Sequence, residues 1–204
     1  KPFLSYYNMV VHELKDFDHL KGKLAGISEK QLVAHLGLYK GYVDKYNEIV
    51  KNLETTERTG NYSYAPFSAL MRAKVIAWNG SILHELYFEN LTGNKTNPSA
   101  DFKSAVEAAF GSWEKWVSEV KAAAASTPGW VLVTWNSIEK KIDTFIVFEH
   151  HIGLPSANEI ILALDCWEHA YMIDYGTNKA DYVKAFLDNI DWDVVGKRFK
   201  TVKK

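Results

Sequence analysis

The stretch "DCWEHAYMIDYG", residues 165–176, marks the point where an apolar strand meets a helix and strong polar groups enter the chain. The preceding run "EIILALD", residues 159–165, is short, apolar and rich in isoleucine and leucine, as buried strands are. A carboxylate at the end of such a strand is costly unless it is paired or bound to a cation. Asp165 and His169 would share one face if residues 166–169 were helical. The pair alone leaves two interpretations open, a metal site and a hydrogen bond that caps a helix.

Hydrophobic periodicity upstream of this stretch predicts a helical hairpin. Residues 28–53 repeat apolar side chains at helical spacing, and Ser28 with Gln31 forms a capping box. Pro66 opens a second helix that extends to about residue 91. A polar loop joins the two, so we expect the helices to pack antiparallel.

The C-terminal half is predicted to mix helices and strands. A third helix is expected over residues 99–126, after which the hydrophobic period changes from 3.6 to 2. Strands are expected at residues 129–136, 143–150 and 159–165, and closing helices at 168–176, 179–190 and 192–200. The sequence thus predicts an α+β fold, a long antiparallel helical hairpin followed by an α/β domain with a small antiparallel sheet of about three strands. We place the domains at residues 1–92 and 93–204, with the candidate site between them.

Composition excludes several classes of protein. The 204 residues hold 24 Lys and Arg against 25 Asp and Glu, so the formal charge of −1 offers no basic field for nucleic acid. No apolar run approaches the roughly 20 residues of a membrane span. The single cysteine, Cys166, rules out a disulfide framework, and its apolar neighbours favour a buried thiol over a nucleophile. We expect a cytoplasmic protein; because the sequence starts without Met, a removed N-terminal targeting segment is the alternative.

Two histidines lie on the apolar faces of the predicted hairpin helices. His35 is flanked at helical spacing by leucine and tyrosine, and His84 is followed closely by Tyr87 and Phe88. A single histidine on such a face is more often a core residue with a satisfied hydrogen bond, but two on facing helices favour a shared partner. Three histidines and one aspartate suit iron, manganese or zinc.

The other histidines carry less information. His12 and His19 lie in a polar N-terminal segment without an apolar stripe, and we predict that they are surface residues. His150 and His151 follow the second predicted strand, where alternation would direct their side chains to opposite faces.

Several segments together resemble the iron/manganese superoxide dismutase family. The run "DCWEHAY", residues 165–171, is similar to that family's D-x-W-E-H-A-Y signature. Further similar segments are "YKGYVDKYN" (39–47), "WNGSILHELYFENL" (78–91), "FGSWEKW" (110–116), "GWVLV" (129–133), "NKADYVKAF" (178–186) and "IDWD" (190–193). The resemblance covers residues 26 to 200, and the agreement of one specific motif with six other segments makes coincidence improbable.

The resemblance implies a function and a ligand set. The family converts superoxide to dioxygen and hydrogen peroxide with one iron or manganese ion per subunit, and we slightly favour iron. The implied metal ligands are His35, His84, Asp165 and His169. Tyr42 is implied as the gateway tyrosine of the substrate funnel, a catalytic residue.

The resemblance also implies surroundings for the metal and an assembly. Trp130 and Trp167 correspond to the aromatic walls of the family's site. Glu168 corresponds to a residue that reaches the ligand histidine of a partner subunit, and Tyr171 lines the same interface. A homodimer or a tetramer is therefore expected, with superoxide as substrate and no nucleic-acid or membrane partner.

The sequence departs from the family pattern in two places. Counted back from Tyr42 without a gap, the family's first ligand falls on Ala34, so we assign His35 and infer one residue fewer in a plain α-helix. Leu38 or Tyr39 then stands where the family usually has a histidine near the gateway, and Tyr39 would be a partial substitute. The family's glutamine, which hydrogen-bonds the solvent on the metal, is replaced by a histidine, and we assign that catalytic role to His151.

Other functions remain as alternatives at this stage. One is a catalytically weakened or inactive family member that serves as a dimeric metal-binding or structural protein, with its first ligand lost if Ala34 occupies that position. Another is a related metalloprotein with weak peroxidase activity. A di-iron carboxylate enzyme would need Glu-x-x-His pairs on helices, and the chain has none. The orientation of His35 distinguishes the first alternative from an active enzyme.

Overall fold

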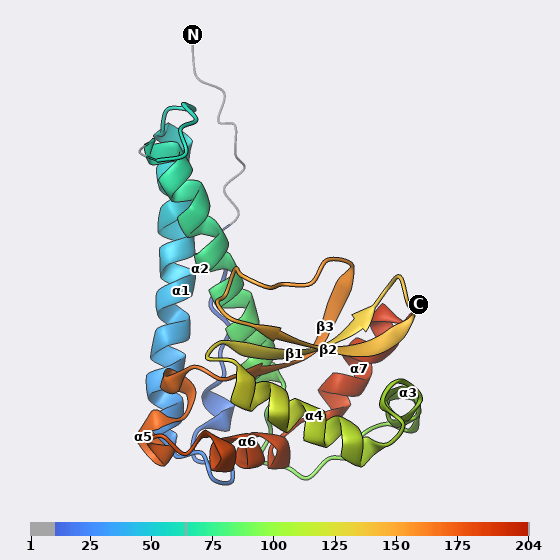
Figure 1. Ribbon diagram of the computed structural model, residues 1–204. Coiled ribbons are helices and arrows are strands. Elements are labelled where there is room, and N and C mark those ends of the chain that lie inside the picture. The colour runs from blue at the N-terminus through green and yellow to red at the C-terminus, as the bar shows by residue number, and fades with distance from the viewer. Residues whose placement is uncertain (1–10, 64, 204) are drawn as a thin grey trace.

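The computed structural model describes residues 11–63 and 65–203, and its first half is a long helical hairpin (Figure 1). Helix α1 spans Glu29–Thr55 and helix α2 spans Pro66–Glu89. The hydroxyl of Ser28 accepts a hydrogen bond from the Gln31 backbone N–H at 3.1 Å, as the capping box predicts. Proline fits the first turn of α2 because the backbone N–H it lacks would have no partner there.

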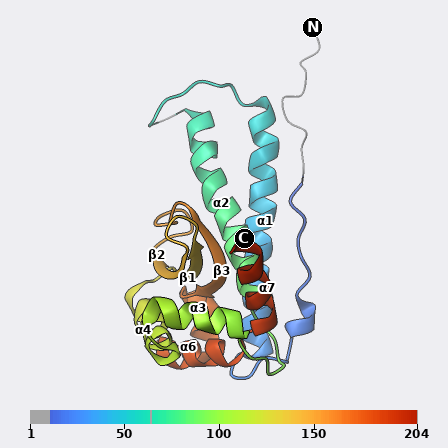
Figure 2. The ribbon, with the colours of Figure 1, turned by 90° about the vertical axis from the view of Figure 1, so that its right-hand side faces the viewer.

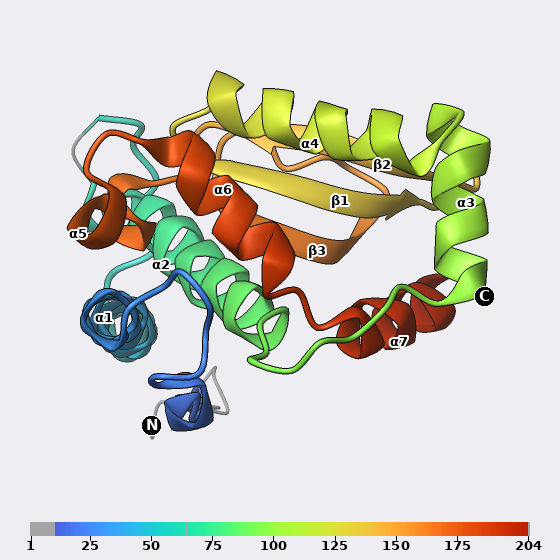
Figure 3. The ribbon, with the colours of Figure 1, turned by 90° about the horizontal axis from the view of Figure 1, so that it is seen from below.

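The second half builds a three-stranded antiparallel sheet in the order β2-β1-β3. Its elements are α3 (Ala100–Phe110), α4 (Trp113–Ser126), β1 (Trp130–Asn136), β2 (Lys141–Val147), β3 (Asn158–Asp165), α5 (Met172–Tyr175), α6 (Lys179–Asp188) and α7 (Trp192–Val202). Helix α4 crosses one face of the sheet with α6 beside it, while α2 approaches β3 (Figure 3). The predicted α+β architecture is confirmed.

The prediction of one continuous helix over residues 99–126 is wrong. Gly111 has φ of 87°, in the left-handed region that ends helices, and it terminates α3. The hydroxyl of Ser112 then accepts from the Lys115 backbone N–H at 3.2 Å and starts α4 in a new direction. The glycine–serine pair is a stop and start signal that the apolar periodicity on both sides concealed.

The predicted helix over residues 168–176 is also wrong in part. Glu168–Ala170 forms a short 3-10 turn, and only Met172–Tyr175 is α-helical. Trp167 before the turn is extended, with ψ of 150°. Asp165 and His169 therefore meet across a turn that leaves a strand and do not share a helical face.

A single hydrophobic core links the base of the hairpin to the sheet. It contains Phe88 of α2, Trp130 of β1 and Phe186 of α6, all fully buried. A smaller cluster around Leu53 packs the outer part of the hairpin, which projects beyond the body of the molecule (Figure 2). The core crosses the boundary proposed at residues 92 and 93, so the candidate site lies inside continuous packing. None of the described helices combines the length and apolar character needed to cross a membrane.

Candidate metal centre

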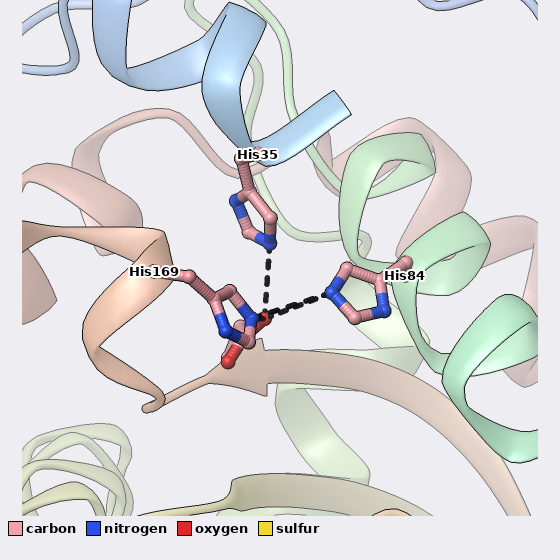
Figure 4. A group of neighbouring side chains, drawn as sticks. His35, His84 and His169 are labelled. Atoms are coloured by element: carbon pink, nitrogen blue, oxygen red, sulfur yellow. Dashed lines mark hydrogen bonds and ion pairs between the residues drawn. The ribbon is translucent and has the colours of Figure 1, made fainter. Parts of the chain in front are cut away.

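Four side chains from four separate elements converge at the junction of hairpin and sheet (Figure 4). His35 comes from α1, His84 from α2, Asp165 from the end of β3 and His169 from the 3-10 turn. Their candidate ligand atoms lie within 4.8 Å of one another. Two nitrogen ligands on opposite sides of one metal lie about 4.2 Å apart, given metal–nitrogen distances near 2.1 Å. The cluster is therefore close to the size of a coordination sphere.

The helix α1 presents His35 to this cluster and not Ala34. His35 is 2% exposed, whereas Ala34 lies on the exposed face. Helix α1 is a continuous α-helix from Glu29 to Thr55. The shortened spacing between His35 and Tyr42 thus leaves regular helix geometry and still directs the imidazole inward.

One carboxylate oxygen of Asp165 is the centre of the cluster. Its Oδ2 lies 3.0 Å from Nε2 of His35 and 3.0 Å from Nε2 of His169. The other oxygen, Oδ1, accepts the backbone N–H of Trp167 at 2.9 Å. This bond fixes the rotation of the carboxylate, so that Oδ2 faces the imidazoles.

The hydrogen bonds within the cluster leave one buried acceptor, on His84, without a donor, and a cation would fill that role. His84 donates its Nδ1–H to the Gly80 carbonyl at 2.6 Å, so the neutral ring leaves a bare lone pair on Nε2. That nitrogen faces Asp165 Oδ2 at 3.5 Å and His169 Nε2 at 3.4 Å. Burial lowers the pKa of His84 well below its ordinary value, so the ring does not gain a proton to bridge the gap. A metal ion satisfies this buried arrangement, and the residues present fit one.

The charge of the cluster suits a divalent or trivalent metal ion. Burial lowers the pKa of His35 as well, against the effect of Asp165. Burial alone would raise the pKa of Asp165, but His169 and His35 outweigh it and hold that pKa well below its ordinary value. Neutral imidazoles with one ionised carboxylate are a donor set for iron, manganese or zinc.

A chain of hydrogen bonds runs beside the cluster through His150. The Trp130 indole N–H donates to His150 Nδ1 at 3.0 Å, and His150 Nε2 lies 2.6 Å from the Tyr42 hydroxyl. Burial lowers the pKa of His150 and raises the pKa of Tyr42, so both groups are neutral. Because an indole only donates, neutral His150 carries its hydrogen on Nε2 and donates to Tyr42.

The placement of His151 beside the metal site is wrong, and His150 occupies that place. His150 is 5% exposed and its ring centroid lies 5.8 Å from that of His84, whereas His151 is exposed to solvent. Strand β2 ends at Val147, and residues 148–152 form a turn in which the Phe148 N–H bonds to the Ile152 carbonyl. Alternation of faces holds only within a strand, so it does not apply to these two histidines.

Two tryptophans enclose the imidazoles as the sequence led us to expect. Trp130 meets the His84 ring edge-on, with centroids 5.1 Å apart. Trp167 is stacked on His169 at 6.3 Å and 12°. The Tyr39 ring stacks on the His84 ring with centroids 6.5 Å apart, and its hydroxyl donates to Glu85 at 3.0 Å. The expectation that Tyr39 partly replaces a gateway histidine stays a prediction.

A pair of tyrosines that sequence analysis missed holds the main chain at Asp165. The Tyr182 hydroxyl donates to the Asp165 carbonyl at 2.8 Å and lies 3.2 Å from the Tyr87 hydroxyl. Both rings are buried, at 0% and 1% exposure. Tyrosine at two core positions, where phenylalanine would pack equally well, was the available signal.

Comparisons with known proteins agree with this geometry. Residues 98–198 match the family model described as iron/manganese superoxide dismutases, C-terminal domain. The chain is 35% identical to the superoxide dismutase [Fe] of Aquifex pyrophilus, over 96% of this chain and 95% of that protein. It is 33% identical to the superoxide dismutase [Mn] 1 of Halobacterium salinarum, over 91% of each. With that similarity over nearly its whole length, the chain belongs to the iron/manganese superoxide dismutase family.

Proposed function

We propose that this chain is a superoxide dismutase, which converts two superoxide ions and two protons to dioxygen and hydrogen peroxide. The observation that best supports this function is the buried Asp165 carboxylate, which faces Nε2 of His84 with no hydrogen atom between the two. The alternative of a weakened or inactive member required the loss of the first ligand. His35 lies in the cluster, and its Nε2 is 3.0 Å from Asp165, so that alternative loses its basis.

The proposed ligands are His35, His84, Asp165 and His169, which would hold one iron or manganese ion per subunit. The ion, when bound, supplies the one-electron oxidation and reduction that no side chain here carries out. The ligand residues contribute a single negative charge. A divalent or trivalent ion therefore leaves the site net positive, which attracts the superoxide anion. We favour iron over manganese as the native metal.

The hydrogen-bond chain beside the cluster prepares Tyr42 to serve as a proton donor. His150 donates to the Tyr42 oxygen, so the hydrogen of the Tyr42 hydroxyl is free to point elsewhere. The Tyr42 ring stacks on His84 with centroids 5.3 Å apart, which places the hydroxyl beside the site. Superoxide reduction needs two protons for peroxide, and the Tyr42 hydroxyl lies beside the site where it would supply one.

A dimer is part of the proposal. Glu168 is exposed, and among the described residues neither its carboxylate nor Nδ1 of His169 has a hydrogen-bond partner. In a dimer with two-fold symmetry, Glu168 of each subunit would accept a hydrogen bond from His169 of the partner subunit. Tyr171, stacked on Tyr182 at 5.2 Å, would support that contact from beneath. We expect the protein in the cytoplasm.

Elemental analysis of the purified protein, together with a superoxide dismutation assay, tests the function. About one iron or manganese per chain with activity is expected, and the assay names the metal when the protein is reloaded with each in turn. The His84→Ala variant should lose both metal and activity, because it removes a donor from a buried site. A metal-free or zinc-loaded inactive wild type, or an active His84→Ala variant, would overturn the proposal.

A further inference from the structure

A second buried ionic cluster lies behind the metal centre, on the outer side of the hairpin. Its centre is Glu85, which is 3% exposed and follows His84 directly on α2. Oε1 of Glu85 lies 2.5 Å from His12 Nε2 and 3.0 Å from the Tyr39 hydroxyl. Oε2 lies 3.0 Å from Lys15 Nζ. Both oxygens are thus paired, although the metal centre uses none of these groups.

Two partners of Glu85, His12 and Lys15, come from the N-terminal segment that lies along α1 (Figure 2). The His12 backbone N–H donates to Asn47 at 2.9 Å, and Asn47 donates back to the His12 carbonyl at 3.0 Å. The Lys15 backbone N–H donates to the Tyr39 hydroxyl at 3.0 Å. The His12 ring also packs on Trp78 of α2, with centroids 5.1 Å apart. His12 is therefore not the free surface residue that the sequence suggested.

The cluster continues from α2 to the strand that carries Asp165. Lys15 also binds Glu89 at 2.8 Å, and Glu89 binds Arg198 of α7 at 2.6 Å. Arg198 then donates to the Ile161 carbonyl of β3 at 3.2 Å and to Asn90 at 2.5 Å. One network therefore joins the N-terminal segment, the end of α2 that carries His84, and β3.

The ion pairs of this cluster add little net stability, because Lys15 is half exposed and water screens its charge. The cluster has its main effect on the relative positions of α1 and α2. Tyr39 lies one turn after His35 on α1, and Glu85 lies one residue after His84 on α2. The Tyr39–Glu85 bond thus ties the two helices together directly behind two of the metal ligands.

We infer that Glu85 is a positioning residue for the metal site, which clamps α1, α2 and the N-terminal segment so that His35 and His84 keep their separation. The inference rests on the proposed function, because it concerns the same metal. Residues that orient metal ligands typically contribute about 10- to 100-fold to metal affinity or activity. Loss of the Glu85 charge leaves Lys15 paired with Glu89 alone and loosens the clamp, so the bound metal should escape faster.

The test compares metal release from the loaded wild type and the Glu85→Gln variant into an excess of chelator. Glutamine keeps the shape and one acceptor for Tyr39 but removes the charge. We expect release at least about tenfold faster, and a changed absorption or paramagnetic resonance spectrum of the remaining bound metal. The Asp44→Asn variant is the matched control, since Asp44 forms only an exposed pair with Lys40 on the same hairpin. The control should release metal at the wild-type rate.

A second variant keeps the inference testable if Glu85→Gln does not fold. Lys15→Met removes the charge from the N-terminal segment, where the lysine is half exposed, and leaves Glu85 in place. It should also accelerate release, whereas Lys40→Met should not. Wild-type release rates and spectra in both Glu85→Gln and Lys15→Met would overturn the inference, even if the metal-free variants melted at lower temperature. A wild type that takes up no metal would instead overturn the proposed function.

Discussion

At the scale of single residues, Asp165 sets the chemistry because its two oxygens have different tasks. Oδ1 accepts the Trp167 N–H at 2.9 Å, which leaves Oδ2 to face three imidazoles. The backbone of the same residue is held by the Tyr182 hydroxyl. Because hydrogen bonds hold both the carboxylate and the backbone of Asp165, little conformational entropy is lost when this residue binds an ion.

His150 and His151 offer a direct test, since adjacent histidines differ only in where their side chains point. His150→Ala removes the acceptor of the buried Trp130 indole and the donor to Tyr42. We expect dismutation to fall by about 10- to 100-fold, as for other residues that tune a metal site from outside its ligands. The free energy of unfolding should fall by about 1–3 kcal/mol, because the indole N–H is left unpaired.

The matched His151→Ala variant should keep wild-type activity and stability, since His151 is exposed. Steady-state dismutation rates and chemical unfolding of the two variants check both statements. Equal loss of activity in both, or loss only in the His151 variant, would contradict the assignment of the role to His150.

These residues show which parts of the site the sequence predicts and which parts depend on tertiary structure. The four clustered side chains follow from a specific motif and from histidines on apolar helix faces. The choice between His150 and His151 depends on where β2 ends and how a turn redirects the chain. Turn geometry is set by tertiary contacts, which one sequence does not display. The partnership of His12 with Glu85 joins positions 73 residues apart and gave no local signal.

At the scale of elements, the crossing of α1 and α2 depends on a glycine that lies against Tyr42. A Cβ added at Gly80 would lie 2.5 Å from Tyr42 Cδ1, well inside van der Waals contact. The Tyr42 ring cannot withdraw freely, because its hydroxyl is 2.6 Å from His150. The glycine thus lets the helices approach closely where the site needs Tyr42.

Gly80→Ala should therefore destabilise the protein, although alanine is the better helix former. Overpacking costs about 1–3 kcal/mol and the helix gain is about 1 kcal/mol, so we expect a net loss of up to about 2 kcal/mol. Activity should fall as well, because Tyr42 must shift. The control is Gly37→Ala on α1, where an added Cβ meets nothing within 4 Å and should stabilise by up to about 1 kcal/mol. Urea unfolding decides: a stabilised Gly80→Ala variant would refute the close-approach argument.

Element boundaries were the weaker part of the sequence prediction. The hairpin helices were expected over residues 28–53 and 66–91 and lie at Glu29–Thr55 and Pro66–Glu89, since caps and proline mark their starts. The sequence prediction missed the break between α3 and α4, because the apolar pattern continues on both sides of Gly111 and Ser112. Periodicity reports which face is buried, and it does not report a change of helix direction that keeps the face buried.

At the scale of the whole molecule, the continuous core makes Cys166 a reporter of global unfolding. The thiol is 1% exposed, and burial, with Asp165 nearby, raises its pKa to about 12. Because that pKa lies above its ordinary value, the thiol stays protonated at pH 8, and a protonated thiol reacts slowly. A thiol reagent should leave the native protein unmodified at pH 8 and label it fully in urea. Rapid labelling of the native protein would show that this region opens locally.

The largest scale is the assembly, which joins two metal sites if Glu168 acts as proposed. Glu168 is exposed beside His169, whose side chain is itself 26% exposed, so the edge of the site is open in one subunit. A partner's carboxylate would close that edge and orient the imidazole through Nδ1. Stability of the dimer and retention of metal are then linked, because each subunit completes the surroundings of the other's ligand.

Glu168→Ala should accordingly weaken both the dimer and the metal site. Truncating one partner of a buried charged hydrogen bond costs about 2–5 kcal/mol, so the dimer dissociation constant should rise by about 30-fold or more. Glu159→Ala is the control, since Glu159 is an exposed carboxylate at the opposite end of β3, paired with Trp135 where Asp165 pairs with Trp130. Sedimentation over a dilution series, with metal content measured on the same samples, separates the cases. A Glu168→Ala variant that dimerises and holds metal like the Glu159 control would place the interface elsewhere on the molecule.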